Sequence, residues 1–145
     1  MRAGVGAIVV DGGRVLLLRR NKEPEAGLWG IQGGAVEFGE TVEAAARREL
    51  EEELGVGCEI VGLLGVTDHI LPEEGAHWVS PVFLAKIGPG GTPRNAEPEK
   101  HSEIGWFDLD GLPEGVTLPT RSAVTLLRER RERKDRADAR DGRGL

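Results

Sequence analysis

Glutamates are concentrated at the carboxyl end of one expected helix. The segment 41–54 contains no helix breaker, and the glycine that follows it, Gly55, is typical of a helix C-terminus. At about 100° per residue, Glu49 and Glu53 lie within about 40° of each other, and Glu52 lies about 100° from Glu53. The three carboxylates therefore share one edge of this helix.

A solvated acidic face is the simplest interpretation of such a run, but the local energetics oppose it. The last turn of a helix is the negative end of its dipole, where each acidic side chain costs about 0.3–1 kcal/mol. Like charges three or four positions apart add roughly 0.2–0.5 kcal/mol per pair. A bound divalent cation would reverse the sign of all these terms. We therefore interpret Glu49, Glu52 and Glu53 as a metal site.

The residue types indicate which metal this is. Carboxylate oxygens with no histidine or cysteine near them in sequence suit a hard cation, so we expect Mg²⁺, with Mn²⁺ as the alternative. Such a cation completes its coordination with water and substrate phosphates. The helix therefore predicts phosphoryl chemistry.

The residues around these glutamates carry a family resemblance. The stretch from Gly34 to Val56, GAVEFGETVEAAARRELEEELGV, resembles the Nudix box, Gx5Ex7REUxEExGU with U aliphatic, at every fixed position. The resemblance implies a fold of the α/β class. This is an α/β/α sandwich with a mixed curved sheet, a catalytic helix and a C-terminal helix, over roughly residues 3–130.

The resemblance also implies a role for each box residue. Glu49, Glu52 and Glu53 match the family's metal ligands, and one of them, or a carboxylate from a later loop, deprotonates the attacking water. Arg48 matches an arginine that orients a box glutamate, and the carbonyl of Gly33 joins the metal shell. Three further matches have structural roles: Gly34, Glu40, which fixes the geometry between loop and helix, and Gly55.

Residues outside the box complete the expected site. The late loop 97–101 is similar to a segment of MutT-like hydrolases in which a carboxylate joins the metal site. Our candidate is Glu99, with Glu97 and Glu103 as alternatives. Two arginines end an expected strand near the box, and Arg20 matches the family's phosphate-binding position better than Arg19.

One position departs from the family pattern, and three histidines have no assigned chemistry. Gln32 stands where proline is usual, which frees φ and affects the rigidity of the loop and the pose of the metal. The histidines at positions 69, 77 and 101 lack metal-ligand spacing, so we interpret them as structural or surface residues.

The remaining elements follow from periodicity and turn residues. Strands are expected over 4–10 and 14–18, joined by the turn Asp11-Gly12-Gly13, and then over 59–68, 77–87 and 104–107. A terminal helix is expected over 120–134. We assign residues 1–134 to one Nudix domain and expect residues 135–145 to be a disordered charged tail.

Composition limits the classes of partner. The chain has 145 residues, which is the common size of one domain, and no apolar run long enough to cross a membrane. Its net charge is −6, but residues 128–145 contribute eight basic and five acidic side chains, so the rest of the chain carries −9. Such an acidic body disfavours a stable nucleic-acid partner. We expect a cytoplasmic protein, and the resemblance makes a homodimer plausible.

These features together predict a metal-dependent hydrolase of a nucleoside diphosphate derivative. The first expectation is a nucleoside triphosphate pyrophosphohydrolase that yields a nucleoside monophosphate and pyrophosphate, on the strength of the segment 97–100. An ADP-ribose or nucleotide-sugar pyrophosphatase is the second. A nucleotide-sensing domain without catalysis is the alternative of another class, which the intact glutamate set disfavours.

Overall fold

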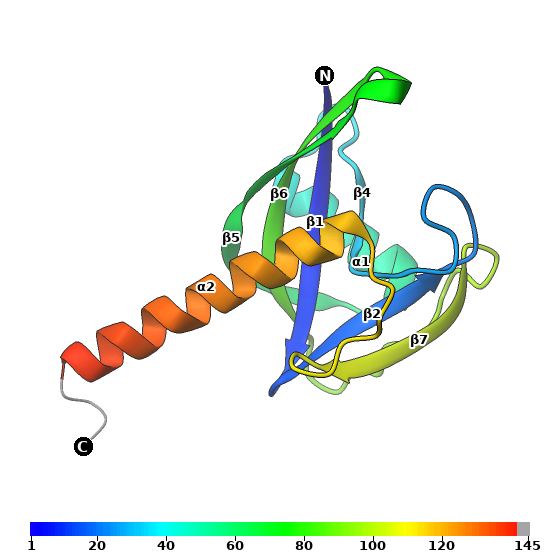
Figure 1. Cartoon of the computed structure of the whole chain (residues 1–145). Helices are drawn as coiled ribbons and strands as arrows, with labels where there is room; N and C mark the ends of the chain where they lie inside the picture. Colours follow the sequence, from blue (N-terminus) through cyan, green and yellow to red (C-terminus); the bar gives the residue numbers. More distant parts are fainter. Residues whose placement is uncertain (142–145) are drawn as a thin grey trace.

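A mixed sheet of seven strands forms the centre of the protein (Figure 1). The computed structural model describes residues 1–141. The strands are β1 (Arg2–Asp11), β2 (Arg14–Arg20), β3 (Trp29–Gly30), β4 (Gln32–Ala35), β5 (Cys58–Leu71), β6 (Ala76–Ile87) and β7 (His101–Asp108). The main order is β3-β2-β1-β6-β5, while β4 pairs with β1 and β7 with β2. Among the strand pairings of residues 1–141, only that of β1 with β6 is parallel.

Strand β1 is shared by two parts of the sheet. Along one edge it pairs with β6 over most of its length, and along the other it pairs first with β4, from Gly4 to Ala7, and then with β2, at Val10 and Asp11. The β1–β2 hairpin turns through Gly12, whose φ of 62° is readily adopted by glycine. The hairpin predicted from the sequence is confirmed.

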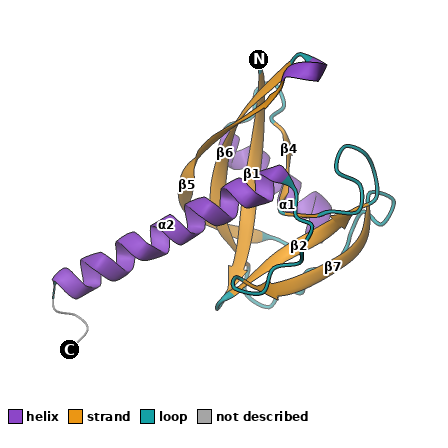
Figure 2. Cartoon of the chain, viewed as in Figure 1, coloured by secondary structure: helices purple, strands orange, loops and turns teal. Residues whose placement is uncertain are grey.

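Two helices cover opposite faces of the sheet (Figure 2). Helix α1 (Val42–Leu54) packs Leu50 and Leu54 against Ala7 and Val9 of β1. Helix α2 (Leu118–Arg140) lies on the other face, where its buried side chains meet the intervening residue of β1, Ile8. Because successive side chains of a strand point to opposite faces, β1 contributes side chains to the hydrophobic core on each face of the sheet. The predicted α/β/α sandwich is confirmed.

The ends of α1 are fixed by Thr41 and Gly55, of which the sequence analysis predicted only the stop at Gly55. Thr41 caps the helix by accepting a hydrogen bond from the N–H of Ala44 at 3.1 Å. Gly55 ends it with a φ of 67°, and a side chain there would also collide with the guanidinium of Arg94. The glycine at this position therefore satisfies both a backbone and a packing requirement.

Helix α2 is longer than the sequence predicts. It runs to Arg140, whereas we expected helix to end at residue 134 and disorder to follow. Its distal half extends beyond the sheet (Figure 1). The expectation rested on the absence of apolar residues that could pack, but alanine, arginine and lysine favour helix without packing. Residues 142–145 of the expected tail lie outside the described residues.

The strands β3 and β4 were not predicted. Their sequences are rich in glycine, which has low strand propensity, so no periodic signal marks them. A side chain at Gly33 would collide with the backbone carbonyl of Val5 in β1. The glycine therefore permits the close approach of β4 to β1.

No helix in the described part of the chain is long and apolar enough to span a membrane.

Candidate active site

The box glutamates differ in exposure because α1 is partly buried. Glu53 is only 8% exposed, Glu49 is half-buried, and Glu52 lies at the surface. The structure thus brings the predicted carboxylates to one edge of the helix but gives each a different environment. Burial, and then the charge of Glu49, raise the pKa of Glu53 well above its ordinary value. Burial is also the main cause of a raised pKa at Glu49.

Arg48 connects these glutamates to the loop before the helix. It donates two hydrogen bonds to Glu40, from Nε at 2.7 Å and from Nη2 at 2.9 Å, and a third to Glu49 at 2.9 Å. It also pairs with Glu52 at 3.4 Å and donates to the carbonyl of Ala35 at 3.1 Å. The hydrogen bonds from Arg48 lower the pKa of Glu40 to about 2. Arg48 therefore bridges Glu40 in the loop to Glu49 and Glu52 on the helix, and the orienting role of Arg48 and the loop-fixing role of Glu40 stay predictions.

Strand β4 places a glycine pair against the carboxylates. The N–H of Gly33 donates to Glu53 Oε2 at 3.1 Å. A side chain at Gly34 would occupy the space of the Glu49 carboxylate. Gly34 therefore allows the Glu49 carboxylate to lie against the backbone of β4, while Gly33 contacts Glu53 through its N–H.

The late-loop glutamates Glu97 and Glu99 differ in their surroundings. The N–H of Ala96 donates to the carbonyl of Glu53 at 3.1 Å, which places this loop at the end of α1. The charge of Glu97 helps to raise the pKa of both Glu49 and Glu53, and it opposes the lowering of the pKa of His101 by burial more than the charge of the exposed Glu99 does. The sequence offered both glutamates, and a spacing of two residues within a loop could not distinguish them.

The two arginines of β2 have different surroundings. Arg20 lines the cavities beside the carboxylates, and its Nε donates to the carbonyl of Pro24 at 2.8 Å. Arg19 pairs with Glu103 at 3.1 Å and donates to the carbonyl of Gly27 at 3.0 Å, and it lines neither cavity. Of the two predicted phosphate ligands, the structure therefore brings only Arg20 to the site. Glu103, an alternative for the late-loop carboxylate, is held by Arg19.

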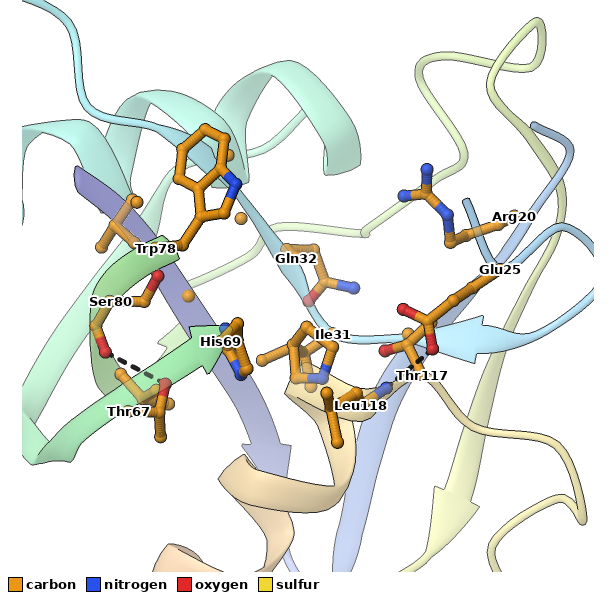
Figure 3. Close-up of a pocket in the computed structure, with 18 of the residues that line it drawn as sticks. Arg20, Glu25, Ile31, Gln32, Thr67, His69, Trp78, Ser80, Thr117 and Leu118 are labelled. Atoms are coloured by element: carbon orange, nitrogen blue, oxygen red, sulfur yellow. Dashed lines mark hydrogen bonds between the residues drawn. The ribbon is translucent and has the colours of Figure 1, made fainter. Parts of the chain in front are cut away.

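Two adjoining cavities meet at Glu53. One, of about 350 Å³, is lined by charged side chains and the glycine pair: Arg20, Lys22, Glu23, Gly33, Gly34, Glu49, Glu53, Lys100 and His101. The other, of about 380 Å³, lies between β5, β6 and the start of α2 (Figure 3). We call these the charged cavity and the deep cavity.

Several residues of the deep cavity were missed by the sequence analysis. Gln32, which stands at the family's proline position, is buried in β4 and lines this cavity. His69 and His101, interpreted as structural or surface residues, line it as well. Trp78 also belongs to its wall. No local motif marks these residues, because they come from four different strands, β4, β5, β6 and β7, and meet only in the folded protein.

The donor set fits a hard divalent cation. The side chains of Glu49, Glu52, Glu53 and Glu97 and the carbonyl of Gly33 offer oxygen only. In the described residues, no three histidine, cysteine, aspartate or glutamate side chains are gathered so that they could hold a metal ion. The metal site expected at these glutamates therefore stays a prediction, in which water and phosphate oxygens would supply the other ligands.

The fold and this site define a class: an α/β/α sandwich with a glycine-rich strand set against the acidic end of a helix. Residues 1–127 match the family model of the NUDIX domain, and the chain belongs to the Nudix family. Family members generally depend on divalent metal ions.

Solved and curated relatives agree with this membership. A crystal structure of a MutT NUDIX hydrolase from Burkholderia pseudomallei is 49% identical, with a TM-score of 0.82, and the match covers 86% of this chain and 96% of that one. The ADP-ribose pyrophosphatase of Methanocaldococcus jannaschii is 36% identical over 74% of this chain. The oxidized purine nucleoside triphosphate hydrolase of Danio rerio is 36% identical over 73%. The chain covers 65% of the length of each of these two curated relatives.

Proposed function

We propose that this protein is a Mg²⁺-dependent hydrolase that cleaves a nucleoside triphosphate to the nucleoside monophosphate and pyrophosphate. The observation that carries the proposal is the position of Glu53. Its buried carboxylate lines both the charged cavity and the deep cavity, whose volume is about 380 Å³. A substrate that spans both cavities would place its phosphates beside the glutamates.

The charged cavity suits a polyphosphate. Arg20, Lys22 and Lys100 line it opposite the carboxylates, so the protein offers cations to the outer phosphate oxygens. Lys100 also pairs with Glu97 at 3.2 Å, which raises the pKa of the lysine and keeps it charged. Mg²⁺, when bound by Glu49, Glu52, Glu53 and Glu97, would neutralise phosphate charge and lower the pKa of a water.

The residues of the chain would then carry out in-line displacement. The carboxylates orient the attacking water, and one of them accepts its proton. The oxygen of the water forms a bond to phosphorus while the bridging P–O bond breaks, and the electron pair leaves with the pyrophosphate. Arg20 and the two lysines stabilise the charge that builds on the phosphate oxygens. Arg48 acts indirectly, because it holds Glu49 and Glu52 in place.

The test is a substrate panel incubated with Mg²⁺ or Mn²⁺ and analysed for products. The panel contains nucleoside triphosphates, ADP-ribose and nucleotide sugars. We expect nucleoside monophosphate and pyrophosphate from a triphosphate, and loss of turnover with a chelator. Faster cleavage of ADP-ribose would favour the activity that the name of the M. jannaschii relative describes. Nucleotide binding without turnover across the panel would favour a sensing domain and contradict the proposal.

A further inference from the structure

Gln32 carries a buried carbonyl oxygen that no group in residues 1–141 satisfies. The residue is 1% exposed, and its Nε2 donates to the backbone carbonyl of Leu16 at 3.4 Å. Its Oε1 has no hydrogen-bond partner within the described chain. Reversing the amide would set its carbonyl against the carbonyl of Leu16, so the free atom is the oxygen. A buried acceptor without a donor is unfavourable for folding and is expected where a ligand supplies the donor.

The position of Gln32 connects this free acceptor to the deep cavity. Figure 3 shows its side chain between His69 and Trp78 on one side and Arg20 and Glu25 on the other. His69 provides a second unsatisfied polar atom in this cavity. Its buried Nε2 also lacks a hydrogen-bond partner in the described residues. Burial lowers the pKa of His69, so its neutral ring can donate or accept a hydrogen bond.

Paired residues of β5 and β6 form another wall of the deep cavity. His69 and Trp78 are opposite each other in the β5–β6 pairing, and Thr67 is opposite Ser80. The position beside them on β1 is Gly4. A Cβ at Gly4 would lie 2.7 Å from Ser80 Oγ and 3.2 Å from Trp78 Cε3. The absence of that side chain keeps this side of the cavity open.

Apolar groups line the cavity on other sides. Ile31 and Leu118 both line it and are drawn in Figure 3. The cavity thus combines apolar walls, an indole and a small number of unsatisfied polar atoms. This is the usual composition of a site for a small heterocycle.

We propose that Gln32 selects the nucleobase of the substrate, with its free amide oxygen accepting a hydrogen bond from an N–H on the edge of a purine. The inference rests on the proposed function, because that function places the nucleoside in the deep cavity. A purine with an amino group or a ring N–H on its six-membered ring satisfies Gln32. A purine that lacks such a donor leaves the oxygen buried and unpaired, and we expect the protein to discriminate against it.

The test compares two substrates in three proteins. The reference substrate is whichever of ATP, GTP and ITP the wild type hydrolyses best, and the comparison is purine riboside triphosphate, which has no N–H on that edge. We expect kcat/KM of the wild type to fall at least about tenfold with the comparison substrate. We call kcat/KM of the reference substrate divided by kcat/KM of the comparison substrate the ratio. In Gln32→Met, which keeps the side-chain size, this ratio should fall to within about threefold of unity.

A matched control separates recognition from packing. Thr67 lines the same cavity, but its hydroxyl already donates to the carbonyl of Ser80 at 3.2 Å. Thr67→Val should therefore retain the wild-type ratio. An equal loss on both substrates in Gln32→Met, with the ratio unchanged, would show that Gln32 only supports strand β4 and would overturn the proposal.

A binding experiment does not depend on catalysis or on the folding of a variant. Calorimetry on the wild type without divalent ions would compare the monophosphate of the preferred base with purine riboside monophosphate. At least about tenfold tighter binding of the donor-bearing nucleotide is expected. Equal affinities would overturn the selection by Gln32. A failure of all turnover with this preference intact would instead count against the proposed hydrolysis alone.

Discussion

The N–H of Gly33 donates to the carboxylate of Glu53 at 3.1 Å and so joins strand β4 to the last turn of α1. These residues are twenty positions apart in the chain, and the contact closes the site between sheet and helix. The single donor compensates only part of the desolvation of Glu53, since burial still raises its pKa well above the ordinary value. The metal-free protein therefore holds a carboxylate that is unfavourable in its ionised form.

We predict that Glu53→Gln stabilises the metal-free protein while it removes activity. The amide oxygen can still accept from Gly33, but it carries no charge. Because the folded-state pKa of Glu53 is raised, its ionised form destabilises the fold at neutral pH, and this effect disappears as the pH falls to the ordinary carboxyl value of 4.5. The thermal midpoint with a chelator should thus rise in the variant at pH 7.5 and match the wild type near pH 4.

The activity of the same variant gives the second half of this prediction. Turnover with Mg²⁺ should fall by about 10²- to 10⁴-fold, the range for loss of a group that handles a proton. Glu51→Gln is the matched control, because Glu51 is an exposed residue of the same helical turn. It should change neither midpoint nor turnover. A lower midpoint for Glu53→Gln in chelator would contradict our view of the Glu53 environment.

The order of elements and the helix of the site could be predicted from sequence because their signals are local. The spacing of Leu50 and Leu54 and the stop at Gly55 are properties of one segment. The strand β4 and the deep cavity could not be predicted in this way. Gln32 and His69 are far apart in the chain, and their proximity depends on how β4 and β5 are arranged around β1. Their unsatisfied atoms become visible only when the fold is known.

We predict that the protein loses stability in acid because the Arg48–Glu40 ion pair is broken there. The pKa of Glu40 is about 2, below the ordinary value of 4.5, so the pair stabilises the fold above pH 4.5 and is lost as the pH falls from there toward 2. Glu40→Gln should therefore show a smaller decrease in thermal midpoint over this window than the wild type. Glu43→Gln is the control, because Glu43 pairs with Arg47 at the exposed side of the helix. An unchanged pH profile in Glu40→Gln would mean that the pair contributes little to stability.

Gly34→Ala should damage the site more than the fold. The added methyl group would occupy the space of the Glu49 carboxylate, which must then move from its place beside Arg48. We expect kcat/KM to fall at least about tenfold, since small displacements at a site are costly for catalysis. Gly13→Ala provides the comparison, because nothing lies within 4 Å of a side chain at that position. Full activity in Gly34→Ala would show that Glu49 can be displaced without consequence.

The late loop allows the sharpest comparison between two neighbouring carboxylates. Ala96 is hydrogen-bonded to the carbonyl of Glu53, and the charge of Glu97 acts on both Glu49 and Glu53, whereas Glu99 is exposed. We therefore predict that Glu97→Gln weakens Mn²⁺ binding and lowers kcat/KM at least about tenfold. Glu99→Gln should leave the affinity for Mn²⁺ and kcat/KM within about threefold of the wild-type values.

Mn²⁺ titration followed by electron paramagnetic resonance would measure the binding directly, with a nucleoside monophosphate present to supply phosphate oxygens. Lys100 offers an internal check, because its pairing with Glu97 is lost in Glu97→Gln but retained in Glu99→Gln. Lys100→Ala should raise KM more than it weakens Mn²⁺ binding, since the lysine lines the charged cavity as a cation and cannot be a metal ligand. If Glu99→Gln were the variant that lost Mn²⁺, the loop would have to rearrange when metal binds, and the assignment of Glu97 would be wrong.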